Sequence, residues 1–303
     1  MKFTIEYPVS VPGYDPALVR PDGMRRVVQA AEGAGFSAVA FTEHPAPSKK
    51  WLDAGGHEAL DPLAALSFCA AVTERIGLMT YLLVLPYHNP FMLAKRLATV
   101  DLLSEGRLTV VAGTGYLRSE FLALGVDMAA RNELFDESIE VMRGVWTNVP
   151  FDHKGRHFEG RGVAALPQPL RPGGPPIWIG GNSGRARQRA AHHQGWSPLM
   201  TTEEIARTTR TPSITTIEQL AAHIAEVRDL AAAVQGKDVS IDVQVQTPAT
   251  RYMHSPGSVE EHRDHLGRLE DAGVTSFVLQ PPGGSVEETV EALQSYGETF
   301  GLS

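Results

Sequence analysis

Residues 177–185 read Ile177-Trp178-Ile179-Gly180-Gly181-Asn182-Ser183-Gly184-Arg185, and the rest of the chain is organised around this stretch. The apolar residues predict a short buried strand, the two glycines a tight turn, and the Arg/Ala-rich residues 185–191 a helix. Glycines let backbone N–H groups approach a ligand closely, and the first turn of a helix adds unpaired N–H donors and partial positive charge. The stretch therefore predicts either a phosphate-binding turn or a plain connection between a strand and a helix.

Outside this stretch, strand-like runs alternate with helix-like runs along the whole chain, as in parallel β/α units. A run of eight β/α units without a break in composition favours a closed barrel over an open doubly wound sheet. We therefore predict an α/β fold, a single (β/α)8 TIM barrel with insertion segments, as one domain spanning residues 1–303. The predicted strands are residues 3–7, 38–41, 76–83, 108–112, 177–179, 196–199, 239–245 and 276–279.

Helix starts are marked by their capping residues. Asn89-Pro90 pairs a capping amide with proline at the first helical position, Ser258 and Ser285 each begin a capping box, and Asp22 is the predicted cap of a helix over residues 23–33. Three segments depart from the β/α pattern. We expect an excursion with a small hairpin over about residues 147–176, and mobile loops over about 200–214 and 246–257.

Composition and charge narrow the class of protein. The 303 residues are 43% hydrophobic and 20% charged, which is typical of a globular chain, and the net charge of -8 argues against general nucleic-acid binding. Cys69 is the single cysteine and lies in an apolar run, so we expect it to be buried. No signal peptide and no apolar run of about 18 residues is visible, so we expect a cytoplasmic protein without membrane spans.

The residues that follow the predicted strands carry the chemistry, because active sites of such barrels lie at the carboxyl ends of the strands. Glu43-His44 follows the second strand, residues 81–86 belong to the end of the third, and Gly113-Thr114-Gly115-Tyr116 follows the fourth. With the turn at 180–183, these residues predict a phosphorylated cofactor and a nearby group that handles protons.

Five segments of the chain form a recognisable combination. They are Phe41-Thr42-Glu43-His44, Leu85-Pro86-Tyr87-His88-Asn89-Pro90, Leu103-Ser104-Glu105-Gly106-Arg107-Leu108, Gly113-Thr114-Gly115-Tyr116-Leu117 followed by Glu120-Phe121, and Trp178-Ile179-Gly180-Gly181-Asn182-Ser183. Together they resemble the bacterial luciferase-like superfamily of flavin and deazaflavin oxidoreductases. The resemblance covers residues 1–200 and, more loosely, the last two β/α units, and it is strongest to the branch that uses the deazaflavin coenzyme F420. Members of that branch have an acidic residue and a histidine after the second strand and a Gly-x-Gly turn after the fourth.

This resemblance implies a homodimer that acts on a small-molecule substrate and holds a cofactor ring in the barrel mouth. It implies that His44 and Glu43 face the ring, and that a non-proline cis peptide joins Tyr81 to Leu82 beneath it. With Tyr116, His44 and Glu43 form the expected catalytic set. The expected cofactor-binding residues are Tyr81, Leu82, Gly113, Thr114, Gly115, Gly180, Gly181, Asn182 and Ser183.

Two departures from the superfamily pattern bear on the cofactor and the reaction. Tyr116 stands where the deazaflavin-dependent sugar-phosphate dehydrogenase has a glutamate proton donor, which argues against sugar-phosphate oxidation, although Trp51 and Gly55-Gly56-His57 resemble that enzyme. Thr114 stands where luciferase has an arginine that grips the flavin phosphate. This exchange favours F420 over FMN as the cofactor.

Alternatives remain open at this point. His44 either handles protons or is a structural histidine bonded to a backbone carbonyl, and Tyr116 is either a hydrogen-bond donor to substrate or an aromatic wall. His192-His193 and the pair His262/His265 lack the companions of a zinc site, so we expect no metal and place them on helix surfaces. The leading prediction is an F420-dependent oxidoreductase. An FMN-dependent monooxygenase and a non-catalytic cofactor-binding barrel are the alternatives.

Overall fold

The computed structural model of the chain describes residues 1–209 and 211–302. Eight parallel strands close into a barrel in the order β1-β10-β9-β8-β7-β4-β3-β2, which confirms the predicted (β/α)8 fold. The barrel strands are β1 (Lys2–Glu6), β2 (Ala38–Phe41), β3 (Gly77–Val84), β4 (Leu108–Gly113), β7 (Ile177–Gly180), β8 (Gly195–Ser197), β9 (Asp242–Val245) and β10 (Ser276–Leu279).

The chain divides by its contacts into two compact units, Met1–Ala40 with Pro176–Ser303, and Phe41–Pro175. The single domain over residues 1–303 stays a prediction. The first unit contains η1 (Pro8–Ser10), η2 (Pro16–Val19), α1 (Pro21–Gly33), α7 (Gly184–Ala190), α8 (Glu203–Thr209), α9 (Ile217–Gln235), η5 (Pro248–His254), α10 (Val259–Asp271) and α11 (Val286–Phe300). The second contains α2 (Lys49–Asp53), α3 (Pro62–Val72), η3 (Leu85–Tyr87), α4 (Pro90–Leu103), α5 (Arg118–Ala123), η4 (Met128–Ala130), α6 (Arg131–Thr147), β5 (Phe151–Lys154) and β6 (Glu159–Val163).

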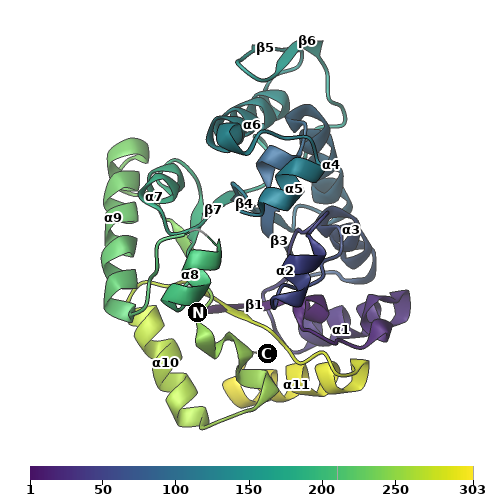
Figure 1. Ribbon diagram of the computed structural model, residues 1–303, viewed down its shortest axis with the longest axis vertical. Helices are drawn as coiled ribbons and strands as arrows, with labels where there is room; N and C mark the ends of the chain where they lie inside the picture. The colour runs from purple at the N-terminus through teal and green to yellow at the C-terminus, as the bar shows by residue number, and fades with distance from the viewer. Residues whose placement is uncertain (210, 303) are drawn as a thin grey trace. The chain divides into compact units, whose positions relative to one another are not determined.

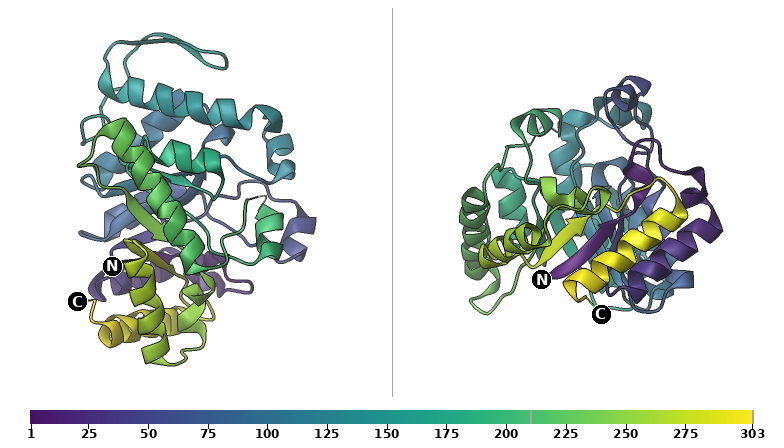
Figure 2. Two further views of the ribbon diagram at one scale, coloured as in Figure 1. Left: turned by 90° about the vertical axis from the view of Figure 1, so that its left-hand side faces the viewer. Right: turned by 90° about the horizontal axis from the view of Figure 1, so that it is seen from below.

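In the first unit, α1 and α11 lie side by side (Figure 2, right). Gly297 on α11 makes this approach possible, because a Cβ there would lie 2.5 Å from the carbonyl oxygen of Ala34. Val27 and Leu293 are fully buried on the two helices. Burying such aliphatic side chains stabilises the unit by about 1.5–3 kcal/mol each.

Polar side chains line the inner face of the strands in this unit. Gln244 on β9 donates its amide to Thr4 on β1 at 3.0 Å, and the Thr4 hydroxyl lies 3.3 Å from that of Ser276 on β10. The Ser197 hydroxyl on β8 reaches Gln244 at 3.5 Å. These side chains are at most 5% exposed, so they satisfy one another in the way that buried polar groups require.

In the second unit, β3 pairs in parallel with β4, with a register shift between Tyr81 and Leu83. α4 and α6 pack together, and the indole N–H of Trp146 on α6 donates to the carbonyl of Ala94 on α4 at 3.1 Å. The excursion predicted at 147–176 contains the antiparallel pair β5 and β6 (Figure 1). Cys69 on α3 is fully buried, as expected.

Three local predictions were wrong. α1 begins at Pro21, so Asp22 lies in its first turn and is not its cap. Part of the segment predicted as a loop over 200–214 forms α8, while Arg210 of that segment lies outside the described residues. His262 is 5% exposed and stacks on Tyr252, so it is not on a helix surface.

Two further predictions concern the second loop and membrane-spanning helices. The segment at 246–257 contains η5, and the structure does not test its mobility. In the part of the chain that the structure describes, no helix is long and apolar enough to cross a membrane.

Candidate active site

Strand β3 holds the first part of the candidate site. The peptide bond between Tyr81 and Leu82 is cis, as the resemblance implies. Both side chains are partly exposed, although the residues on either side of them, Thr80 and Leu83, are fully buried. Near the carboxyl end of a barrel strand, such exposure leaves a surface that a ligand can cover.

The Gly-x-Gly turn after β4 packs directly against this part of β3. A Cβ at Gly113 would lie 2.3 Å from Leu82 Cδ1, and a Cβ at Gly115, where φ is +75°, would lie 2.7 Å from Val84 Cγ1. Both distances are far shorter than real contacts between carbon atoms, so no larger residue fits without a shift. Gly115, with its positive φ, is therefore needed by the packing of β3 on β4, whereas a methyl group at Gly113 requires the Leu82 side chain to move.

Glu43, directly after β2, connects β2 to the end of β3. Its carboxylate accepts a hydrogen bond from the backbone N–H of Val84 at 2.6 Å and one from His88 Nε2 at 2.8 Å. The side chain is about 5% exposed, and each oxygen has a partner. These contacts fit a positioning role for Glu43, and its predicted place in the catalytic set stays a prediction.

His44 is held by a buried carboxylate. His44 Nδ1 lies 3.3 Å from Glu120 Oε2, and the same carboxylate accepts the Tyr87 hydroxyl at 3.0 Å and the Ala46 backbone N–H at 3.3 Å. Glu120 on α5 is 1% exposed. A carboxylate facing Nδ1 favours the tautomer with its proton on that nitrogen, which leaves Nε2 to exchange a proton with a ligand. The alternative of a histidine tied to a backbone carbonyl is not what the contacts show.

Aromatic rings pack around His44. The centroid of its ring lies 4.6 Å from that of Trp51, 4.9 Å from that of His57 and 6.1 Å from that of Tyr116. Gly56 leaves room for the indole, because a Cβ there would lie 2.4 Å from the ring of Trp51. Burial lowers the pKa of His57, so this neighbour stays neutral near pH 7.

The two tyrosines of this group remain protonated near neutral pH. Burial, with a further contribution from the Glu120 carboxylate, raises the pKa of Tyr116 to about 12. Burial and Glu120 raise the pKa of Tyr87 further above its ordinary value. Tyr87 uses its hydroxyl on Glu120, while Tyr116 can act as a donor to a ligand and cannot act as a base at pH 7.

The turn after β7, in the first unit, is held together by its own chain. Gly181 has a φ of +102°, which favours glycine, and its N–H donates to the carbonyl of Ser197 at 3.1 Å. Ser183 caps α7 by accepting from the backbone N–H of Ala186 at 3.1 Å. The strand, turn and helix predicted at 177–191 are thus confirmed, and phosphate binding by the turn stays a prediction.

Asn182 fastens this turn to the segment that follows β8. Its amide nitrogen donates to the carbonyls of Leu199 at 2.7 Å and Pro212 at 2.8 Å, and its amide oxygen accepts from the Leu199 N–H at 2.9 Å. The side chain is fully buried. Arg187 adds a bond to the Asn182 carbonyl at 2.7 Å. The Asn182 amide is therefore fully used within the chain, so any contact it makes with a phosphate is not through that amide.

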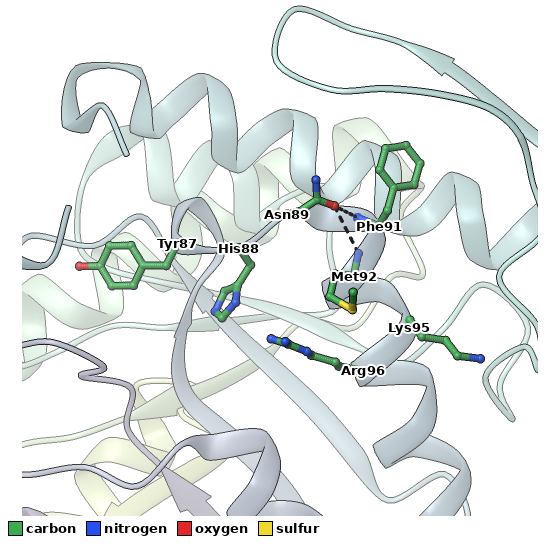
Figure 3. A pocket seen from close by; sticks show the side chains of 7 residues that line it. All are labelled: Tyr87, His88, Asn89, Phe91, Met92, Lys95 and Arg96. Atoms are coloured by element: carbon green, nitrogen blue, oxygen red, sulfur yellow. Dashed lines mark hydrogen bonds between the residues drawn. The ribbon is translucent and has the colours of Figure 1, made fainter. Parts of the chain in front are cut away.

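A pocket of about 690 Å³ opens at the start of α4. Asn89 caps this helix by accepting from the N–H groups of Phe91 and Met92. Figure 3 shows Tyr87 turned away from Lys95 and Arg96, both on α4. The pocket is thus part of the surface of α4. Two of its lining residues also bond to the candidate site, Tyr87 to Glu120 and His88 to Glu43. The pocket is lined by Tyr87, His88, Asn89, Phe91, Met92, Lys95 and Arg96.

The second unit brings most of the predicted site residues into one neighbourhood. Glu43, His44, Tyr81, Leu82 and the turn at 113–116 all belong to it. The turn at 180–183 belongs to the first unit and is described by itself. Among the described residues, no group of three or more His, Cys, Asp and Glu side chains could hold a metal ion. Glu120, Tyr87 and His88 stand in the motif segments quoted above but were not among the predicted site residues, and the structure bonds them to His44 and Glu43.

Residues 1–301 match the family model of the luciferase-like monooxygenases, and the chain belongs to this family. The FMNH2-dependent dimethylsulfone monooxygenase of Pseudomonas fluorescens is 31% identical over 179 residues, which are 58% of this chain and 47% of that protein. An uncharacterised protein of Sinorhizobium fredii, y4vJ, is 31% identical over 160 residues, 53% of this chain and 44% of that protein. The chain spans about half the length of these curated relatives.

Solved structures show the same fold. The monooxygenase RslO1 from Streptomyces bottropensis has a TM-score of 0.76 at 23% identity, covering 99% of this chain and 98% of that one. An F420-dependent secondary alcohol dehydrogenase in complex with an F420-acetone adduct has a TM-score of 0.71 at 17% identity, covering 100% and 99%. At these identities the likeness concerns the fold alone.

Proposed function

We propose that this protein is an oxidoreductase that moves a hydride between the deazaflavin coenzyme F420 and a small organic substrate. The observation that carries this proposal is the pairing of His44 with the buried carboxylate of Glu120. Oxidation or reduction of an organic substrate by hydride transfer needs a group that gives or takes a proton beside the reacting atoms. A histidine whose ring is oriented by a buried carboxylate supplies such a group.

The residues present fit a flat cofactor. Leu82 presses on Gly113 where a Cβ has no room, and the partly exposed Tyr81 and Leu82 leave uncovered surface on β3. These residues would hold the ring. When bound, the deazaflavin accepts or donates the hydride. Both kinds of cofactor occur among the similar proteins. One similar solved structure is F420-dependent, and one curated relative is FMNH2-dependent.

Side chains of the protein have three further proposed roles: proton exchange, hydrogen bonding to the substrate and exclusion of water. His44 exchanges the proton through Nε2, and Glu120 positions the imidazole ring through Nδ1. Tyr116 donates a hydrogen bond to the substrate oxygen, since its raised pKa keeps the hydroxyl protonated. Trp51 and His57 pack against the imidazole and exclude water.

Anaerobic turnover tests this proposal. A panel of alcohols and carbonyl compounds is mixed with oxidised or reduced F420, and the absorbance of the cofactor is followed without oxygen. We expect turnover in wild type and its loss in His44→Ala, with the F420 affinity of that variant within a few-fold of wild type. Turnover that requires both FMNH2 and oxygen would contradict the proposal.

A second candidate is an FMN-dependent monooxygenase, because a curated relative of that activity matches at 31% identity. Oxygen uptake that depends on substrate and on reduced FMN distinguishes it from the first. The implied homodimer is also proposed, and sedimentation of the purified protein tests it.

A further inference from the structure

His88 lies at the junction of η3 and α4, one residue before Asn89, the cap of α4. Its backbone N–H donates to the carbonyl of Leu85 at 3.1 Å, and its side chain is 16% exposed. His88 Nε2 lies 2.8 Å from Glu43 Oε1. A carboxylate can only accept a hydrogen bond, so the imidazole donates through Nε2. His88 therefore holds one oxygen of a carboxylate 45 residues earlier in the chain.

The other oxygen of Glu43 holds the end of β3. Glu43 Oε2 accepts the backbone N–H of Val84, the last residue of β3, at 2.6 Å. The Glu43 side chain is almost fully buried, so its charge has to be compensated by hydrogen bonds within the protein. Hydrogen bonds to a charged group are stronger than those between neutral groups. His88 and Val84 thus fix the carboxylate through both of its oxygens.

The side chain of Val84 packs against the Gly-x-Gly turn after β4. A Cβ at Gly115 would lie 2.7 Å from Val84 Cγ1, so the backbone of the turn touches this side chain. Tyr116 follows Gly115 directly, and the centroid of its ring lies 6.1 Å from that of His44. Close-packed interiors transmit displacements, so a shift of Val84 moves the turn that carries Tyr116.

We propose that His88 is a positioning residue of the candidate active site. By donating to Glu43, it holds that carboxylate on the backbone N–H of Val84. This keeps Tyr116 and His44 at a fixed separation, because Glu43 directly precedes His44 in the chain. A displacement of reacting groups by about 1 Å can lower a rate by about 10²-fold. The inference rests on the proposed function, which gives Tyr116 and His44 their roles.

Two amide substitutions separate the hydrogen bond of Nε2 from the rest of the ring. Glutamine places its N–H donor where histidine has Nε2, whereas asparagine places its donor where histidine has Nδ1. With the substrate and cofactor on which wild type turns over, we expect His88→Asn to lower kcat by about tenfold or more and to change KM only a few-fold. His88→Gln should recover most of the lost kcat.

The matched control is His157→Asn. His157 Nε2 lies 3.1 Å from Glu133 Oε2 in a histidine–glutamate pair outside the candidate site, so this substitution should leave kcat unchanged. Equal kcat values for His88→Asn and wild type would overturn the inference. A His88→Gln variant as slow as His88→Asn would do the same, because the ring itself would then be needed. So would a loss of kcat that merely follows a loss of thermal stability in both variants.

Hydrogen exchange tests the positioning without any cofactor. We expect peptides that cover the end of β3 and the turn at 113–116 to exchange several-fold faster in His88→Asn than in His88→Gln. Peptides that cover β5 and β6 should exchange equally in both. Equal exchange throughout would contradict the inference. If wild type turns over no substrate with F420, the proposed function fails, while hydrogen exchange still decides the role of His88.

A measurement on wild type keeps the inference testable if His88→Asn does not fold. Nitrogen NMR of the histidine side chains, with the His88 signals assigned by their absence in His88→Gln, shows which ring nitrogen carries a proton. We expect a proton on Nε2, since that nitrogen faces Glu43. A proton on Nδ1 alone would exclude the hydrogen bond and with it the positioning role.

Discussion

At the scale of single residues, Glu120 decides how His44 can act. The carboxylate collects three donors, from His44, Tyr87 and the backbone of Ala46, in a place that is almost closed to water. Hydrogen bonds to a charged group are stronger than neutral ones, so this arrangement fixes the imidazole ring. Glu43, the more obvious neighbour in sequence, is bonded instead to Val84 and His88.

Replacing Glu120 by Gln should therefore impair the reaction more than the fold. We expect kcat to fall by about 10²-fold, because the imidazole of His44 loses the carboxylate that orients it. The matched control is Glu133→Gln, since Glu133 on α6 pairs at the surface with Arg156 and His157. A fall in kcat no larger than that of Glu133→Gln would show that the carboxylate only supports the fold.

Tyr116 allows its two interpretations to be separated. If its hydroxyl donates to the substrate, Tyr116→Phe should lower kcat/KM roughly fivefold. One hydrogen bond in the transition state is lost, which raises the activation free energy by about 1 kcal/mol. F420 affinity serves as the control and should not change. Equal kcat/KM values for the two proteins would favour an aromatic wall.

The sequence could point to His44 but not to Glu120, and the reason is distance along the chain. His44 follows a buried strand directly, so a rule about strand ends finds it. Glu120 lies in α5, after the Gly-x-Gly turn, and nothing in the spacing shows that its carboxylate turns back to a residue 76 positions earlier. A glutamate next to the apolar Phe121, on a helix only six residues long, was the available signal.

At the scale of elements, the turn after β7 shows how a glycine-rich motif can serve the fold first. Strand positions followed from apolar runs, and β10 coincides with its predicted residues 276–279. α8 was missed because its segment is rich in Thr and Arg, which are not arranged with helical periodicity. The role of Asn182 was hidden as well, because its partners Leu199 and Pro212 lie 17 and 30 residues away.

Asn182→Ala should destabilise the fold substantially. The change removes three hydrogen bonds made by a fully buried side chain, each of which contributes about 1 kcal/mol to stability. We expect the free energy of unfolding, measured with urea, to fall by about 3 kcal/mol. A loss below about 0.5 kcal/mol would contradict the role of Asn182 as a structural link.

The contact between β3 and the Gly-x-Gly turn can be tested by a double-mutant cycle. Gly113→Ala places a methyl group against Leu82, so we expect it to lower stability by about 1–3 kcal/mol. Leu82→Ala removes the obstacle, and the double variant should lose less than the sum of the single variants. If the losses of stability in the two single variants add up to that of the double variant, the destabilisation by Gly113→Ala does not come from the contact with Leu82.

At the scale of the whole molecule, a buried histidine links stability to pH. His262 lies among aromatic rings, and its Nε2 is 3.0 Å from the Tyr296 hydroxyl. Burial, with a smaller effect of His265, lowers the pKa of His262 to about 4. The sequence placed it on a surface because histidine is usually exposed or partly exposed, and the rings that cover it come from three distant elements.

This histidine should make the protein less stable in acid. The unfolded chain takes up a proton on His262 below about pH 6.5, whereas the folded chain does so only near pH 4. Stability from this group is full above pH 6.5 and is lost as pH falls toward 4, with a slope of up to about 1.4 kcal/mol per pH unit. Urea unfolding of wild type and His262→Gln from pH 4 to 8 should show a smaller slope in the variant, and equal slopes would exclude His262 as the source.

The central claim is that this luciferase-like barrel binds a deazaflavin for hydride transfer. Equilibrium titration of the purified protein with F420 and with FMN, followed by fluorescence under one set of conditions, tests that claim most directly. We predict that F420 binds at least about tenfold more tightly than FMN, a difference of about 1.4 kcal/mol. Tighter binding of FMN, or no binding of F420, would contradict the claim.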